Sequence, residues 1–224
     1  MTDATKAPDA AGPTPDPPTT RGERRRAATR SKLVDAAREL FAEKGIEATR
    51  INEISETADL AFGSFYTHFA SKDAIVAAVT EDATAAAGAK IEAITRTVDD
   101  PAEVISVAHR YLVRSAGADQ EWGWLLVRLE QTNDLVTATL GPYAIRDLER
   151  GIEAGRFDVK NPALALLATG GALLGVIRGV LRGQLKRDVD REHAATVLRM
   201  LGVSAADAAE VASRPMPRMT ARAD

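Results

Sequence analysis

The chain lacks cysteine altogether, and among its 224 residues only ten are aromatic: five Phe, three Tyr and two Trp. The absence of cysteine excludes a disulfide framework, a thiolate metal site and a cysteine nucleophile. Only three histidines occur, far apart in sequence, and there is no Gly-rich phosphate loop, Glu-x-x-His pair or nucleophile elbow. We therefore expect no enzymatic activity, no metal site and no cofactor.

Long hydrophobic runs are also lacking. The longest nearly apolar stretch, residues 163–177, has fifteen residues and contains three glycines. A membrane helix needs about 20 apolar residues. The first 20 residues are polar and proline-rich, which is not the pattern of a secretory signal. These features predict a soluble, cytoplasmic protein without a membrane partner.

Alanine is abundant and β-branched residues seldom alternate, a composition that favours helices over strands. We expect an all-α protein of about nine helices, with a further short turn near residues 204–207. Gly141-Pro142 either opens or kinks the seventh helix. The expected ranges are 23–44, 50–59, 62–68, 71–95, 101–116, 119–134, 141–155, 162–185 and 190–201.

Several helix starts carry a recognisable capping residue. Thr49 and Ser71 are candidate N-caps, and Asp100 and Asn161 each precede a proline at the first helical position. Gly45 suits the C-terminal end of the first helix. We divide the chain into a disordered tail (1–20), a helix-turn-helix domain (21–75), an effector-binding and dimerisation domain (76–212) and a second disordered tail (213–224).

The net charge of −3 conceals a basic segment near the N-terminus. Residues 21–32 contain six basic side chains and one acid, so the rest of the chain carries about −8. An acidic protein with one basic end is suited to bind a polyanion at that end. A solvated, flexible arm is the alternative interpretation.

Four of the ten aromatic residues fall within "AFGSFYTHFASKDAI", residues 61–75. Two short helices joined by a tight turn at residues 58–60 form a helix-turn-helix pattern. The turn favours a left-handed residue, and Asp59 tolerates that conformation. On the second helix Phe65 and Phe69 lie one turn apart, and such a short helix needs buried anchors of this kind.

The segment "ADLAFGSFYTHFASKDAI", with "LVDAARELFAEKGIEATRINEIS" upstream, strongly resembles the DNA-binding segment of TetR-family transcriptional regulators. The resemblance covers roughly residues 30–80, and beyond it the chain agrees only in helix number and length. The residues in register with the family motif are Gly63, Phe65, Tyr66, His68, Phe69, Ser71, Lys72 and Asp73.

Three positions depart from the family pattern. Asp59 stands where relatives often have Gly, and Ala61 where they often have Ser, so a side-chain N-cap is missing. Phe62 replaces a residue that is polar in many members. Its angle on the helix favours partial burial beside Phe65, and contact with a thymine methyl group is the alternative.

The resemblance implies which side chains meet double-stranded DNA. Tyr66 would contact phosphate, and His68 would contact phosphate or a base edge. Arg24, Arg25 and Arg26 would enter the minor groove as a mobile arm, with plain solvation as the alternative. The full DNA-binding set, including helix-start candidates for phosphate, is Thr49, Arg50, Phe62, Gly63, Ser64, Tyr66, Thr67, His68 and Lys72.

The second half of the chain carries fewer signals. A stripe of four glycines at four-residue spacing, Gly171, Gly175, Gly179 and Gly183, permits close approach of another helix. That helix belongs either to the same chain or, as the resemblance implies, to the partner subunit of a homodimer.

A small-molecule pocket is expected among the fourth to eighth helices. Trp124, Arg128 and Gln131 share one face of the sixth helix, an aromatic plate beside polar groups. Tyr111 and Tyr143 would add hydroxyl groups. His109 is isolated in the sequence and is interpreted as a structural or surface residue.

We therefore interpret the chain as a regulator that binds a palindromic operator as a dimer and is released by a small, partly apolar effector. The expected role is repression, and activation is the alternative that the sequence leaves open. Two alternatives stay open: a ligand-carrying or catalytic helical bundle, and a regulator switched by a protein partner.

Overall fold

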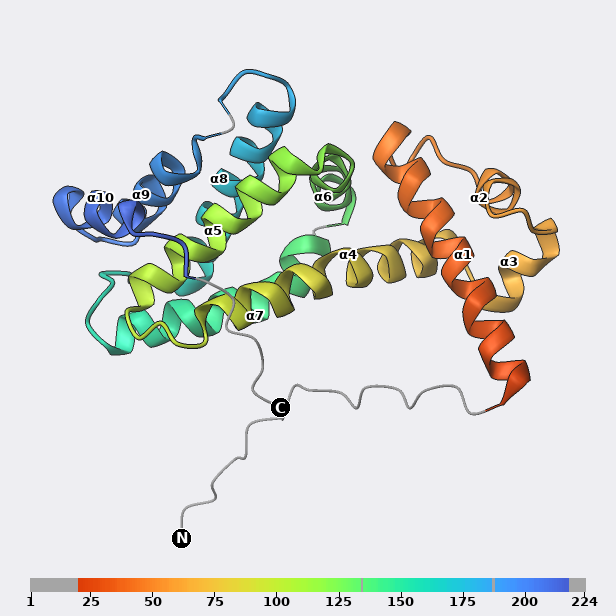
Figure 1. Ribbon diagram of the computed structural model, residues 1–224, viewed down its shortest axis with the longest axis horizontal. Helices are drawn as coiled ribbons and strands as arrows, with labels where there is room; N and C mark the ends of the chain where they lie inside the picture. Colours follow the sequence, from red (N-terminus) through yellow and green to blue (C-terminus); the bar gives the residue numbers. More distant parts are fainter. Residues whose placement is uncertain (1–19, 134, 187, 218–224) are drawn as a thin grey trace, which may run out of the picture.

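The computed structural model describes residues 20–133, 135–186 and 188–217, with the side chains of 131–138 left out. Over this part of the chain the fold is all-α, as predicted, and contains ten helices (Figure 1). Their bounds are α1 Arg21–Lys44, α2 Ile51–Thr57, α3 Phe62–His68, α4 Lys72–Thr95, α5 Pro101–Ala118, α6 Gln120–Asn133, α7 Leu135–Glu153, α8 Pro162–Leu181, α9 Asp190–Met200 and α10 Ala205–Ser213.

The first helix begins earlier than expected because Thr20 and Glu23 form a reciprocal capping box. Arg24, Arg25 and Arg26 therefore lie inside α1, and the prediction that they form a mobile arm is wrong. At the other end Gly45 adopts a φ of 88° and closes the helix, as the sequence indicated.

The turn between α2 and α3 has the predicted left-handed residue. Asp59 has a φ of 54°, and it is the one residue other than glycine with positive φ in the described part of the chain. This conformation lets the backbone N–H of Leu60 donate to the Ser55 carbonyl at 2.9 Å and reverses the chain within three residues. The short helix α3 follows at once.

Three later helices start at the capping residues that the sequence indicated. Side-chain oxygens of Ser71, Asp100 and Asn161 accept hydrogen bonds from the backbone N–H groups of Ala74, Ala102 and Leu164. Such bonds satisfy amide groups that have no partner within the helix. The predicted starts of α4, α5 and α8 are therefore confirmed.

Two helices in the second half differ from expectation. α7 begins at Leu135, so Pro142 lies inside it and does not open it. α8 ends at Leu181 because Gly183 adopts a φ of 70°, which takes the chain out of the helix. Gly183 is therefore not part of the predicted glycine stripe.

The chain end that was expected to be disordered begins in an ordered segment. Ser213 closes α10, and the Arg214 guanidinium donates to Asp100 at 3.2 Å, Glu103 at 2.7 Å and Glu210 at 2.9 Å. These ion pairs fasten the end of α10 to the start of α5, so the described structure extends past residue 212.

The helices form two groups linked by α4 (Figure 1). Helices α1–α3 lie at one end, and α4 runs from them to α7 at the other. One hydrophobic core joins α1–α4 to α6, because Leu125, Leu126 and Leu129 of α6 are buried in it. The predicted boundary at residue 75 therefore falls inside α4 and inside a continuous core.

The helix α8 is unusual in how little of it is covered. Among the described helices it is the one long and apolar enough to suit a membrane span, yet only 22% of its apolar window is buried. Its Leu164 and Leu167 are each 62% exposed. Exposed leucines at this spacing form an apolar face suited to another protein surface.

Candidate nucleic-acid interface and effector pocket

Helix α3 has one buried and one exposed face. Phe65 and Phe69 are 0% and 4% exposed and pack against α1, α2 and α4, which confirms their predicted role as anchors. Gly63, Tyr66 and Thr67 are exposed to solvent. The anchoring of one face leaves the other free to approach a ligand as large as a DNA groove.

Phe62 lies on the exposed side of α3, although the sequence had favoured its partial burial. It is 53% exposed, and its ring packs edge-on against that of Tyr66 with centroids 5.6 Å apart. The space behind α3 is filled by Phe65 and Phe69, so Phe62 is held by its neighbour one turn along the helix. Two adjacent aromatic rings therefore stand at the surface of α3.

Thr49 is neither the N-cap of α2 nor exposed for a phosphate contact, although both had been expected. Its side chain is 1% exposed and its hydroxyl donates to the Gly45 carbonyl at 2.7 Å. Arg50 takes the N-cap position of α2, and its backbone N–H donates to the Glu53 carboxylate at 2.7 Å. The exposed Arg50 is thus available to a phosphate, and the Thr49 side chain is not.

Basic groups border α3 on the side of α1. Burial lowers the pKa of His68, and the guanidinium groups of Arg26 and Arg30 lower it further. A neutral imidazole offers one donor and one acceptor, which suits a base edge or a phosphate. Lys72 lies at the start of α4, and its ammonium group donates to the Glu47 carbonyl at 3.5 Å.

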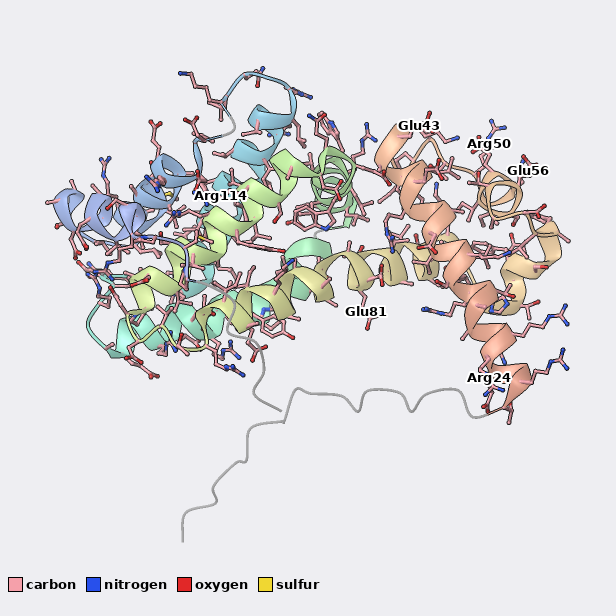
Figure 2. All side chains as sticks on the ribbon, in the orientation of Figure 1. Arg24, Glu43, Arg50, Glu56, Glu81 and Arg114 are labelled. Atoms are coloured by element: carbon pink, nitrogen blue, oxygen red, sulfur yellow. The ribbon has the colours of Figure 1, made fainter. Side chains whose placement is uncertain are left out.

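The basic segment of α1 and the start of α2 belong to the same end of the molecule (Figure 2). Arg24 is labelled near the first turn of α1 and Arg50 at the start of α2. Arg24, Arg25 and Arg26 are all exposed, so the side chains remain accessible although the backbone is helical. Ser64 is half-buried on the inner edge of α3.

The residues of α6 that the sequence assigned to an effector pocket make other contacts. The Arg128 guanidinium donates to the Phe41 carbonyl at 3.2 Å and also to that of Ala42, and it lies 5.4 Å from the Trp124 ring centroid. It therefore caps the C-terminal carbonyls of α1, since a cation is favoured there. The Gln131 side chain lies outside the described residues.

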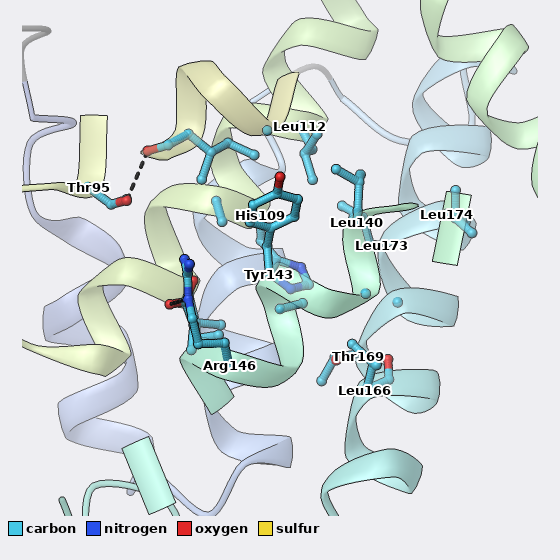
Figure 3. Close-up of a pocket in the computed structure, with 18 of the residues that line it drawn as sticks. Thr95, His109, Leu112, Leu140, Tyr143, Arg146, Leu166, Thr169, Leu173 and Leu174 are labelled. Atoms are coloured by element: carbon cyan, nitrogen blue, oxygen red, sulfur yellow. Dashed lines mark hydrogen bonds and ion pairs between the residues drawn. The ribbon is translucent and has the colours of Figure 1, made fainter. Parts of the chain in front are cut away.

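A cavity of about 140 Å³ does lie among α4–α8, where the sequence placed a pocket (Figure 3). Of the predicted residues whose side chains the structure describes, Tyr143 lines it, and Tyr111, Trp124 and Arg128 do not. Its walls are mostly aliphatic, with contributions from every one of the five helices. Examples are Ile91, Leu112, Leu126, Leu140, Leu166, Leu173 and Ile177.

Charged residues of α7 line the same cavity. Arg146 lies 3.6 Å from Asp147 and 5.7 Å from the centroid of the Tyr143 ring. Burial raises the pKa of Asp147, while Arg146 and Arg150 oppose that effect. Glu92 of α4 lines the cavity too and adds a small further increase to this pKa.

The sequence did not reveal a pair of histidines at the cavity. His109 of α5 lines it, and its Nδ1 lies 3.0 Å from Nε2 of His193 on α9. Burial lowers the pKa of His109 to about 3 and that of His193 to about 4, so both rings are neutral near pH 7. The two residues are 84 positions apart, and no local pattern links them.

The glycines of the α8 stripe differ in the space around them. A Cβ atom on Gly171 or Gly175 would have no neighbour within 4 Å. On Gly179 it would lie 2.8 Å from Cδ1 of Leu185, so this glycine serves packing within the chain. Gly171 and Gly175 continue the apolar face of Leu164 and Leu167.

These features define a class of protein. The short helix α3 follows a tight turn, has one buried and one exposed face, and lies beside basic residues. This arrangement is a helix-turn-helix reading head. It is joined through a shared core to a helical domain with a mostly apolar cavity. Together they define a transcriptional regulator with its own ligand-binding domain.

The chain belongs to the TetR family. The family model described as "Bacterial regulatory proteins, tetR family" matches residues 33–79, and that described as "Tetracyclin repressor-like, C-terminal domain" matches residues 100–214. Members of this family bind operator DNA as dimers and bind small-molecule effectors.

Solved structures agree with this assignment over most of the chain. RolR in complex with the ligand resorcinol is 38% identical, with 88% of this chain and 99% of that one covered and a TM-score of 0.71. The FadR regulator of Bacillus subtilis, solved with stearoyl-CoA, is 21% identical, covers 76% of this chain and 96% of its own, and has a TM-score of 0.63. The latter similarity shows the fold alone.

Curated relatives match over the DNA-binding segment. The transcriptional repressor KstR2 of Rhodococcus jostii is 45% identical over 47 residues, 21% of this chain and 23% of KstR2. The KstR2 of Mycolicibacterium smegmatis is 38% identical over 56 residues, 25% of this chain and 27% of that protein. The chain thus matches only about a quarter of the length of these repressors.

Proposed function

We propose that the protein is a homodimeric, cytoplasmic repressor that binds a palindromic operator and is released by a small, partly apolar effector. The observation that carries this proposal is the exposed face of α3, held rigidly by Phe65 and Phe69 and flanked by basic residues. The cavity among α4–α8 supplies a place for the effector.

In the proposed complex the exposed face of α3 enters the major groove. Gly63 lets the helix approach closely, and Ser64, Thr67 and His68 offer hydrogen bonds to base edges or phosphates. The Phe62 ring, 53% exposed beside Tyr66, is suited to contact a thymine methyl group. Tyr66 contributes its hydroxyl to a phosphate.

Phosphate contacts would surround this reading face. Arg50 at the start of α2 and Lys72 at the start of α4 lie at helix N-termini, where anions are favoured. The exposed arginines at positions 24, 25 and 26 would reach the backbone or the minor groove from a rigid helix. Such contacts make binding strongly dependent on salt concentration.

Dimerisation would use the exposed apolar face of α8. Leu164, Leu167, Gly171 and Gly175 share this face, and the two glycines permit a partner helix to approach. A two-fold axis through this face would pair α8 with its symmetry mate. The two copies of α3 would then need a separation of about 34 to 36 Å to meet successive major grooves.

The effector would bind in the cavity of about 140 Å³, with aliphatic walls and a polar side formed by α7. The similarity to RolR, solved with resorcinol, favours a small aromatic compound. Binding there would alter the packing of α4, which connects the cavity to the reading head.

The proposal is tested by footprinting and gel-shift assays on the DNA next to the gene. We expect a protected palindrome whose affinity falls steeply with salt. A Tyr66→Ala/His68→Ala variant should lose operator binding and stay dimeric by sedimentation, whereas Tyr111→Phe should behave as the wild type. Equal affinity of the double variant and the wild type would refute the assignment of α3 as the reading helix.

A further inference from the structure

The proposed function assigns no role to the paired histidines at the cavity. Nδ1 of His109 is 3.0 Å from Nε2 of His193, so a single hydrogen bond joins the rings. His109 lines the cavity, as Figure 3 shows beside Tyr143. The remaining ring nitrogen of His109, Nε2, is then the one left for a molecule in the cavity.

The neutral state of both rings gives this nitrogen two possible roles. One proton occupies the bond between the rings, and it can sit on either nitrogen. With the proton on Nδ1 of His109, Nε2 is an acceptor. With the proton on Nε2 of His193, His109 must carry its own proton on Nε2, which becomes a donor. A hydroxyl group, which both donates and accepts, fits either arrangement.

The two threonine hydroxyls at the cavity already donate to backbone carbonyls of their own helices. The Thr95 hydroxyl donates to the Ile91 carbonyl at 2.9 Å, and that of Thr169 to the Ala165 carbonyl at 2.8 Å. Arg146 is paired with Asp147 and lies over Tyr143. Among the described lining residues, His109 thus offers a polar atom on the otherwise aliphatic wall formed by α5.

The volume of the cavity limits the size of the apolar part of the ligand. An apolar cavity of about 150 Å³ holds one benzene ring. The cavity here has about 140 Å³ and aliphatic walls from five helices. A single six-membered ring fills it, while a fused-ring compound or a long acyl chain exceeds it without a rearrangement.

We propose that the His109–His193 pair is the recognition site for the hydroxyl group of a single-ring phenolic effector. The ring lies among the aliphatic side chains and its hydroxyl bonds to Nε2 of His109. His193 acts as a positioning residue, since its hydrogen bond from α9 fixes the orientation of the His109 ring. This inference rests on the proposed function and names the chemical class of its effector.

Calorimetric titration with phenol and toluene tests the proposal, because the two molecules differ by a hydroxyl in place of a methyl group. The quantity compared is the ratio of the two affinities. In His109→Leu we expect this ratio to fall about tenfold from its wild-type value, through loss of one hydrogen bond. Tyr111→Phe, on α5 but outside the cavity, should keep the wild-type ratio.

The matched variant within the cavity is Tyr143→Phe, which removes the hydroxyl of another lining residue. A wild-type ratio in this variant supports the proposal. If the ratio falls in Tyr143→Phe and not in His109→Leu, the hydroxyl is recognised by α7 and the proposal is overturned. Failure of every single-ring compound to bind the wild type overturns it as well.

Two further measurements cover a variant that does not fold. His109→Leu/His193→Leu replaces both hydrogen-bonding partners with apolar groups, which avoids a lone buried imidazole. In the wild type, ¹⁵N-histidine labelling gives signals from only three residues. Phenol should shift those of His109 and His193 and not that of His68, and unchanged signals at saturating phenol would overturn the proposal.

The operator assay separates this inference from the proposed function. Phenol could bind with the expected dependence on His109 and yet not release operator DNA. That result would support the His109–His193 recognition site and contradict the proposal that phenolic compounds are the releasing effectors. If operator DNA is released by a compound whose binding is insensitive to His109, release stands and the histidine site fails. Resorcinol, with a second hydroxyl, serves as an additional probe in both assays.

Discussion

At the scale of single residues, Asp59 fixes the geometry of the reading head. Its φ of 54° is in the left-handed region, where a side chain with a Cβ atom is strained and Gly is not. Asp and Asn are tolerated because a short polar side chain can bond locally. The turn that joins α2 to α3 passes through this position.

We expect Asp59→Ala to lower the free energy of unfolding by about 1 kcal/mol, because Ala has neither the freedom of Gly nor a polar group. Asp59→Gly should match or slightly exceed the wild type. Urea denaturation monitored by circular dichroism measures both. A loss of the same size in Asp59→Gly would show that the carboxylate matters and not the backbone angle.

The buried histidines predict how stability depends on pH. Their pKa values in the folded protein, about 3 and about 4, lie below the ordinary value of 6.5. The unfolded chain therefore binds more protons between these values, and stability rises with pH across this window. The contribution is fully present above the unfolded pKa and is lost as pH falls towards the folded values.

As pH falls from about 6.5 to about 4.5 we expect the loss to approach 1.4 kcal/mol per pH unit for each proton taken up on unfolding. The variant His109→Leu/His193→Leu should show a flatter profile. The charged groups on α5 and α9 beside this pair form ion pairs, Arg110 and Arg114 each with Asp190. Identical slopes for both proteins would contradict the burial of neutral imidazoles.

Side-chain environments were the part of the structure that the sequence predicted least well. Phe65 and Phe69 were assigned correctly, because their burial follows from the spacing within one helix. Thr49, Phe62 and Arg128 were not. The Thr49 hydroxyl turns back to Gly45 and the Phe62 ring turns outward to Tyr66, whereas Arg128 depends on groups that another segment brings near. Arg128, for example, meets carbonyls 86 and 87 positions away.

At the scale of helices, local signals were more informative. Capping residues predicted the starts of α4, α5 and α8, because each bond spans two or three positions. The end of α8 was missed by four residues, as Gly183 was taken for a helical residue and instead closes the turn after the helix. The sequence placed the cavity correctly among the fourth to eighth helices, but of the predicted lining residues with described side chains it had named Tyr143 and no other.

The contact of α6 with α1 carries a prediction at this scale. Replacing Arg128 by Met keeps much of the side-chain volume but leaves the Phe41 and Ala42 carbonyls without their cationic donor. We expect a loss of about 1 to 3 kcal/mol in the free energy of unfolding. Arg199→Met, at an exposed position of α9, should change it by less than about 0.5 kcal/mol.

Denaturation curves followed by tryptophan fluorescence are suited to this test, since Trp124 lies against Arg128. A similar loss in both variants would mean that the α6–α1 contact adds nothing beyond general surface charge.

At the scale of the whole molecule, the exposed face of α8 predicts the oligomeric state. Leu167→Lys places a charge among apolar groups that the proposed interface would bury, and burial of an unpaired charge is costly. We expect this variant to sediment as a folded monomer and to lose at least tenfold in operator affinity. Ala154→Lys, an exposed position after α7, should remain dimeric.

If Leu167→Lys sediments as a dimer with unchanged operator affinity, dimerisation does not use this face. Helical content measured in parallel establishes that the variant is folded.

The capping box at Thr20 and Glu23 has a consequence for the thermodynamics of DNA binding. It extends α1 through residues 21–32, so the basic side chains sit on a backbone that is already ordered. Docking then requires no coupled folding of this segment, and its conformational entropy is not lost in the complex. We expect the heat capacity change of operator binding, from calorimetry at several temperatures, to match that of rigid-body association, well short of the large negative values that accompany coupled folding.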